Sequence, residues 1–369
     1  MVNVISRLAV LLILSFATVT ALAQSGRVQP TPTPEETVKV ETEEIKLNVL
    51  AFDSKGQFFK DVSANDLVIT ENDILHQPAS VRRIPANVLI VLDTGGEMRY
   101  VKSLDRTRQI ARALIAALRP EDNVALIQYS DKAELVDDFT SDRKRTLDAL
   151  MKRTNFGRGS AMIEALTLAT ETLQKLQVDN RQLVLITDGT DGRDRNSARF
   201  EAFQRLTATD ISVHVFSYAS LESTDIEPRT KGISNSPPPK AMPDEVAQQL
   251  PNGARDVATA PKSKTITIDR DFLQRMKSRK ASLEVAEIEL RKLTDSTNGE
   301  FILPVSVDEM IDKAPLVARM IDSAYVVTYM PKVPVIATRG LAERKIEVTS
   351  KRFGLDVQAR RRVLVQDSK

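Results

Sequence analysis

The sequence contains no cysteine and only two histidines among its 369 residues. Without cysteine the chain forms neither disulfide bonds nor thiolate metal sites, and it has no cysteine nucleophile. Because zinc enzymes and Ser-His-Asp hydrolases rely on histidine, the scarcity of this residue argues against both classes. One of the two, His214, lies in the apolar run from Ile211 to Phe216, a position typical of a hydrogen-bonded core histidine.

A surplus of charge of either sign is missing as well. The chain has 52 lysines and arginines against 50 aspartates and glutamates. This balance gives no general attraction to nucleic acid or to an anionic lipid surface, so we expect neither as a partner. Hydrophobic residues make up 42% of the chain, enough for a sizeable core. The length fits two or three domains at roughly 150 residues each.

Long hydrophobic runs are confined to the N-terminus. Arg7 precedes an apolar stretch from Leu8 to Phe16, and Ala21-Leu22-Ala23 follows as an A-x-A processing site. This pattern predicts a secretory signal peptide over residues 1–23, and therefore an exported protein, periplasmic or secreted. A membrane anchor is the alternative, but the apolar run is shorter than the about 20 residues of a spanning helix. No membrane span is expected once the signal is removed.

The rest of the chain divides by composition into further segments. Residues 24–37 form a Pro/Thr linker, and residues 38–84 alternate apolar and polar positions as short β-strands do. Residues 85–331 alternate strand and helix patterns around a proline-rich insertion at 221–265, and residues 332–369 return to alternating strands. Each β segment alone has too few strands to be stable, so we expect the two to pack together as one small accessory domain.

The stretch from Asn87 to Met98, NVLIVLDTGGEM, is the centre of the α/β segment. Its apolar run ends on Asp93 and is followed by a glycine pair and a helical pattern. A second apolar run, Leu183 to Ile186, leads in the same way to Asp188. Unbroken apolar runs between helices predict a doubly wound, mostly parallel sheet of Rossmann-like type. Parallel strands deliver the residues that follow them to one edge of the sheet, so both aspartates are expected in one crevice there.

A third candidate residue lies between these two strands in the sequence. Gly157-Arg158-Gly159-Ser160 precedes the helical pattern from Met162 to Leu176, so we expect the Ser160 hydroxyl at a helix start. Two carboxylates and a hydroxyl in one crevice form a set of oxygen ligands. Hard divalent cations such as Mg²⁺ prefer such a set.

The order of these motifs resembles that of the von Willebrand factor A (VWA) domain. Proteins of that family carry a metal-ion-dependent adhesion site, MIDAS, built from a D-x-S-x-S loop, a hydroxyl at a helix start and the aspartate of a T-D-G turn. Asp93, Ser160 and Asp188 match these three elements in the same order. Gly95 and Glu97 stand where the two serines belong. The resemblance therefore implies a degenerate MIDAS, in which Glu97 is the candidate to replace a lost ligand.

The resemblance implies a metal site and a surrounding rim. Mg²⁺ or another divalent cation is expected on Asp93, Glu97, Ser160 and Asp188. The rim that contacts a ligand is expected to comprise Thr94, Gly95, Arg158, Thr190 and Asp191. Without a metal the acids would repel one another, and Arg158 is then the expected ion-pair partner.

Two other patterns in the same loops have different meanings. D-T-G at 93–95 is the signature of aspartic proteases, but that fold is almost wholly β and a helical pattern follows directly here. The run DGTDGRD, with acids at 188, 191 and 194, looks like a calcium loop. It lacks the bidentate glutamate and the spacing of an EF-hand, so a polar turn after a strand is the simpler interpretation.

The end of the α/β segment is similar to a group of exported acidobacterial VWA-related proteins, in LTDSTNGEFILPVS, the helix after it and SAYVVTYMP. That group has no established biochemical activity. From the resemblance to VWA domains we expect an exported, non-enzymatic protein-interaction or adhesion module. Its partner would be a protein or another extracytoplasmic macromolecule. The alternative is a hydrolase in which Asp93 and Asp188, or a metal on them, activate water. A hydrolase needs a positioned base and a pocket, and the acids come without an obvious nucleophile.

Overall fold

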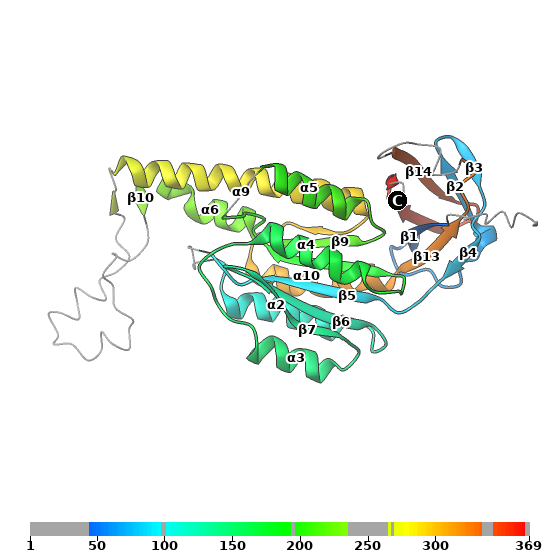
Figure 1. Ribbon diagram of the computed structural model, residues 1–369, viewed down its shortest axis with the longest axis horizontal. Helices are drawn as coiled ribbons and strands as arrows, with labels where there is room; N and C mark the ends of the chain where they lie inside the picture. Colours follow the sequence, from blue (N-terminus) through cyan, green and yellow to red (C-terminus); the bar gives the residue numbers. More distant parts are fainter. Residues whose placement is uncertain are drawn as a thin grey trace, which may run out of the picture. The chain divides into compact units, whose positions relative to one another are not determined.

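Figure 1 shows a computed structural model of the chain, which describes residues 44–96, 101–192, 196–234, 265–266, 269–333 and 342–365. The predicted signal peptide, the Pro/Thr linker and most of the proline-rich insertion lie outside these residues and stay predictions. Within the described ranges, no helix combines the length and the apolar character that crossing a membrane requires.

A six-stranded sheet forms the centre of the α/β unit. Its order is β12 (Phe301–Ile302), β9 (Ser212–Ser217), β8 (Arg181–Thr187), β5 (Asn87–Asp93), β6 (Asn123–Tyr129) and β7 (Ala133–Thr140). All neighbours are parallel except β7, which runs antiparallel to β6 at the edge. The predicted doubly wound, mostly parallel sheet is confirmed. Strand β7 was not predicted, because acidic residues interrupt its apolar positions.

Helices cover both faces of this sheet (Figure 1). One face packs against α2 (Leu104–Ala117), α3 (Arg143–Lys152) and α10 (Val307–Asp322), and the other against α4 (Met162–Gln174), α5 (Asn196–Thr207) and α9 (Arg270–Thr297). Along β5, Val88 and Ile90 pack on the first side, whereas Leu89 and Val91 pack on the second. A strand buried on both faces needs apolar residues at every position, which explains its unbroken apolar run.

Two antiparallel sheets form the accessory domain. One has the order β15 (Leu355–Ala359), β1 (Ile45–Asp53), β13 (Ala324–Tyr329) and β4 (Ser80–Arg82). The other has the order β16 (Arg362–Val365), β14 (Ala342–Ser350), β2 (Leu67–Glu71) and β3 (Ile74–His76), and a 3-10 turn, η1 (Ala64–Asp66), precedes β2. Leu47 and Val327 of the first sheet share a buried core with Ile69 and Ile346 of the second. The predicted fold class, with a small β domain built from both ends of the chain, is therefore confirmed.

Strand β13 departs from the sequence analysis, which placed it in the α/β segment ending at residue 331. It pairs antiparallel with β1, Tyr329 opposite Ile45, and with β4, Thr328 opposite Ser80. Its side chains pack into the accessory core instead of the core of the α/β unit. The sequence of an apolar strand does not show which sheet the strand joins, so the pattern alone assigned β13 to the wrong unit.

The start of the predicted insertion at 221–265 is also corrected. Residues Ala219–Thr230 form the helix α6, which lies beside α9 (Figure 1). Ile226 of α6 and Leu283 of α9 are buried against each other. Beyond it, β10 (Ile233–Ser234) pairs antiparallel with β11 (Thr265–Ile266). The helix escaped prediction because its apolar residues are few and Pro228 lies in its last turn.

His214 occupies the core position that the sequence predicted. The residue is 1% exposed, and its Nε2 lies 3.1 Å from Gln182 Oε1 while its Nδ1 accepts the Glu300 N–H. Burial lowers the pKa of His214 to about 4, so the ring is neutral at ordinary pH. It is a satisfied structural residue in the sheet.

Gly299, directly after α9, gives a test of how the chain enters β12. Asn298, the C-cap of α9, has the left-handed conformation, with a φ of 59°. A Cβ atom on Gly299 would lie 1.8 Å from the Val213 carbonyl oxygen. We expect Gly299→Ala to force β12 away from β9 and to cost roughly 1–3 kcal/mol of unfolding free energy, measured by urea denaturation.

The matched control is Gly192→Ala. A Cβ atom there would meet only Ser160 backbone atoms at 3.5 Å or more, an ordinary contact. The unfolding free energy of this variant should stay close to that of the wild type. Equal losses in both variants would contradict the proposed steric cause.

Candidate functional site

The carboxyl edge of the central sheet brings the two predicted aspartates together. Strands β5 and β8 are hydrogen-bonded neighbours, with Leu92 opposite Ile186, so Asp93 and Asp188 emerge side by side. Asp93 is 0% exposed and Asp188 is 1% exposed. Two buried carboxylates on neighbouring strand ends need a positively charged partner.

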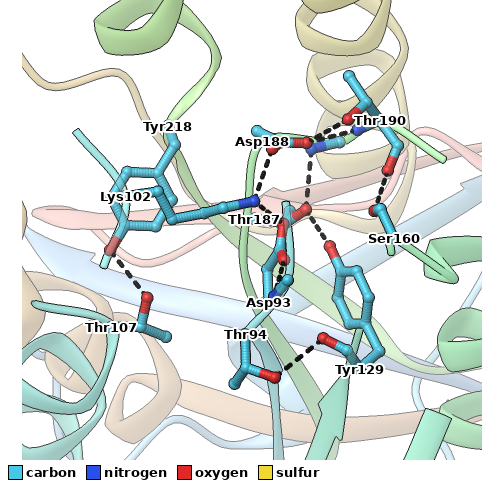
Figure 2. Close-up of polar contacts among 12 residues, drawn as sticks. Asp93, Thr94, Lys102, Thr107, Tyr129, Ser160, Thr187, Asp188, Thr190 and Tyr218 are labelled. Carbon is cyan, nitrogen blue, oxygen red and sulfur yellow. Dashed lines mark hydrogen bonds and ion pairs between the residues drawn. The ribbon is translucent and has the colours of Figure 1, made fainter. Parts of the chain in front are cut away.

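That partner is Lys102. Its Nζ donates to Asp93 Oδ2 at 2.8 Å and to Asp188 Oδ2 at 2.7 Å (Figure 2). Lys102 is 4% exposed and directly precedes Ser103, whose hydroxyl caps the start of α2. Burial alone would lower the pKa of Lys102, but the carboxylates of Asp188 and Asp93 raise it above its ordinary value. The ammonium group therefore stays charged.

The other carboxylate oxygens are bound by nearby loop residues. Asp93 Oδ1 accepts the Gly95 N–H at 3.1 Å. Asp188 Oδ1 accepts the N–H of Thr190 at 2.8 Å and its hydroxyl at 2.7 Å. Burial raises the pKa of Asp93. Burial also opposes ionisation of Asp188, but Lys102 and Arg279 together hold the pKa of that carboxyl well below its usual range.

A second layer of charges connects this pair to helices α6 and α9. Arg279 of α9 donates to Asp188 Oδ2 at 3.0 Å, to Thr190 Oγ1 at 2.6 Å and to Glu222 Oε2 at 2.8 Å. Glu222, from α6, is 3% exposed, and its Oε1 has no hydrogen-bond partner among the described residues. Burial, and then the negative charge of Asp188, raise the pKa of Glu222 to about 7. The cluster thus contains two cations and three acids.

The third predicted residue, Ser160, does not contact the aspartates. Its hydroxyl donates to the Thr190 carbonyl oxygen at 2.7 Å, which ties two loops together (Figure 2). The expected place of Ser160 at the helix start was wrong, because Ala161 is the N-cap of α4. Asp191 acts there instead, since its Oδ2 accepts the Ile163 N–H at 2.8 Å. Both residues hold the loops in place.

The predicted rim residues differ in their accessibility. Thr94, Gly95 and Thr190 are buried, whereas Asp191 is half-buried and Arg158 is exposed. Glu97 lies outside the described residues. Arg158 was expected to pair with the acids when no metal is bound, and this was wrong, because Lys102 pairs with them.

Lys102 was missed by sequence reasoning, although one signal was present. A lysine directly before a helix N-cap faces the positive end of the helix dipole. Such a placement is more favourable when acids lie close by, as Asp93 and Asp188 do here.

These residues do not fit a divalent cation as they lie. The Lys102 ammonium is already within 3 Å of both carboxylates, and a metal there would meet a like charge. The Ser160 hydroxyl faces the Thr190 carbonyl. Over the described part of the chain, no three acidic or histidine side chains gather in a way that could hold a metal. In the predicted calcium-like run, Asp188 and Asp191 have partners within the protein, and Asp194 lies outside the described residues.

Glu222→Gln gives a test of the buried cluster through pH. The pKa of Glu222 is about 7 in the folded chain, against an ordinary value of 4.5. The folded state therefore holds this proton more tightly than the unfolded state. The resulting stability is present below pH 4.5 and is lost as the pH rises through 7. We expect Glu222→Gln to gain roughly 3 kcal/mol over the wild type across this window, in urea unfolding at a series of pH values.

Glu284→Gln, at an exposed position of α9, is the control for this measurement. Glu284 lies outside the buried cluster, so this variant reports the effect of removing an exposed acid from the same helix. If the difference in unfolding free energy between Glu222→Gln and the wild type did not change with pH, Glu222 would not be the group that takes up the proton.

Comparison with known proteins agrees with the order of the motifs. Residues 88–190 match the family of von Willebrand factor type A domains. A protein of Borreliella burgdorferi, itself uncharacterized, is 28% identical over 117 residues, which make up 30% of this chain and 34% of that protein.

Solved structures with a similar fold are distant in sequence. An aerotolerance-related membrane protein from Bacteroides fragilis is 17% identical, with a TM-score of 0.38, and the match covers 63% of this chain and 98% of that one. A von Willebrand factor type A protein from Catenulispora acidiphila is 11% identical, with a TM-score of 0.42, and the match covers 89% and 74%. The narrower resemblance to exported acidobacterial proteins stays a prediction. The part of the α/β unit from β5 to the loop after β8, residues 88–190, thus matches the von Willebrand factor type A domain family, and both buried aspartates lie within it.

Proposed function

We propose that this protein is an exported, non-enzymatic interaction module that holds a protein or another extracytoplasmic macromolecule at the carboxyl edge of its central sheet. VWA domains are generally interaction modules without catalytic activity. The observation that carries the proposal is the pairing of Lys102 with two buried aspartates. Both aspartates have partners within the protein, and they support loops instead of reaching a substrate.

The loops at this edge form a connected platform. The Gly157 N–H donates to the Thr94 carbonyl oxygen at 3.1 Å, and the Gly159 N–H donates to Asp131 Oδ1 at 2.8 Å. The Gly192 N–H in turn donates to the Ser160 carbonyl oxygen at 2.8 Å. Rigid loops that present exposed side chains lose little entropy on binding.

The exposed residues of this platform carry both signs of charge. Asp131 and Lys132 follow β6, and Arg158 follows α3. A polar rim of this kind suits a macromolecular partner with complementary charges.

The hydrolase alternative finds no support at this site. Water activation would require Asp93 or Asp188 to contact water or substrate, but both are buried and paired with Lys102. The low pKa of Asp188, which Lys102 and Arg279 maintain against burial, also makes it a poor general base.

Export makes a simple prediction about the mature chain. The A-x-A pattern ending at Ala23 predicts cleavage before Gln24. In a host with a general secretory system, intact-mass measurement of the protein from the extracytoplasmic fraction should match a chain that begins at Gln24. Recovery of the uncleaved chain in the cytoplasm alone would contradict export.

Charge reversal at the rim tests the binding role. We expect Arg158→Glu to weaken capture of the native partner from envelope extract at least tenfold, because an exposed guanidinium at the platform becomes a carboxylate. Capture is measured by cross-linking and mass spectrometry. The purified partner is then titrated with the wild type and with the variant.

Arg112→Glu is the matched control, since Arg112 is exposed in the middle of α2. It changes the net charge by the same amount and should leave capture unchanged. Equal capture by both variants would show that the binding surface does not include the carboxyl edge of the central sheet.

A further inference from the structure

Two cations contact the pair of buried aspartates, and one of them lies between the two carboxylates. Lys102 contributes one positive charge to Asp93 and Asp188, and Arg279 contributes a second one to Asp188. All three contacts are 3.0 Å or shorter. Arg279 also pairs with Glu222, so Lys102 is the cation that lies between the two carboxylates, where a metal would otherwise bind.

The loop after β5 is shaped to hold the ammonium group. A Cβ atom on Gly95 would lie 1.9 Å from the Gly159 carbonyl oxygen, so no hydroxyl-bearing side chain fits at this position. Gly96 has a φ of 115°, and a Cβ atom there would lie 3.1 Å from Lys102 Nζ. The glycine pair thus removes a ligand position and lets the backbone pass close to the lysine.

We infer that Lys102 is a built-in cation in the place of a divalent metal, so that the wild-type site works without metal and a latent metal site lies beneath the lysine. Two carboxylates, fixed by neighbouring strands, remain once the lysine side chain is shortened. Asp188 is further oriented by Thr190. Water fills the remaining positions of a hard cation readily. This inference does not depend on the identity of a binding partner.

The test compares two variants at position 102. Lys102→Ala removes the charge and opens space between the carboxylates, whereas Lys102→Met removes the charge and keeps the space filled. Manganese is titrated into the wild type and both variants by calorimetry, and the thermal midpoint is measured with manganese and with a chelator.

We expect only Lys102→Ala to bind a single manganese ion and to gain thermal stability from it. The wild type should show no saturable binding and no response to the chelator, and Lys102→Met should be destabilised without rescue by manganese. Adding Asp188→Asn to Lys102→Ala should abolish the binding.

Refolding from denaturant, with and without manganese, gives the same readout if Lys102→Ala is not recovered in native form. Manganese should then raise the native fraction of Lys102→Ala and not that of Lys102→Met. A wild type that binds manganese through Asp188, or a Lys102→Ala chain that neither binds manganese nor refolds with its help, overturns the inference.

Discussion

The need to neutralise two fixed carboxylates governs this structure. Asp93 and Asp188 end hydrogen-bonded parallel strands, so they cannot separate without disrupting the sheet. Both are buried, and an unpaired buried charge is costly. Lys102 meets this need from the position before the N-cap of α2, and the loop of Gly95 and Gly96 accommodates it. One ammonium group thus connects the start of α2 with the ends of two strands and lies beside a glycine loop.

The same requirement reaches beyond the edge of the sheet. Arg279 of α9 binds both Asp188 and Glu222 of α6, so charges connect these two helices to the site, while apolar contacts join the helices to each other. Glu222 is one acid more than the two cations balance, and its pKa near 7 follows from burial and from Asp188. The protonation state of one glutamate therefore bears on how firmly α6 and α9 are held at the carboxyl edge of the sheet.

Sequence periodicity predicted which segments form strands, but not which distant strands and side chains pair with one another. The apolar run ending on Asp93 identified a buried parallel strand, because a strand covered on both faces has no other pattern. The pattern could not tell that Tyr329 lies opposite Ile45. It predicted the meeting of Asp93 and Asp188 from topology, yet not that Lys102 lies between them, since side-chain direction before a helix cap is not periodic. Ser160 was placed one residue too close to its helix, where Ala161 is the cap.

The pairing of β1 with β13 has a consequence for the order in which the chain folds. The accessory domain begins with β1 to β4 and is completed only by β13 to β16, so the whole α/β unit lies within it as an insertion. A ribosome releases the first four strands long before β13 and β14, the strands with which β1, β4 and β2 pair. Their edges stay open to association with other chains until then, and no single cut in the chain would free one unit intact from the other.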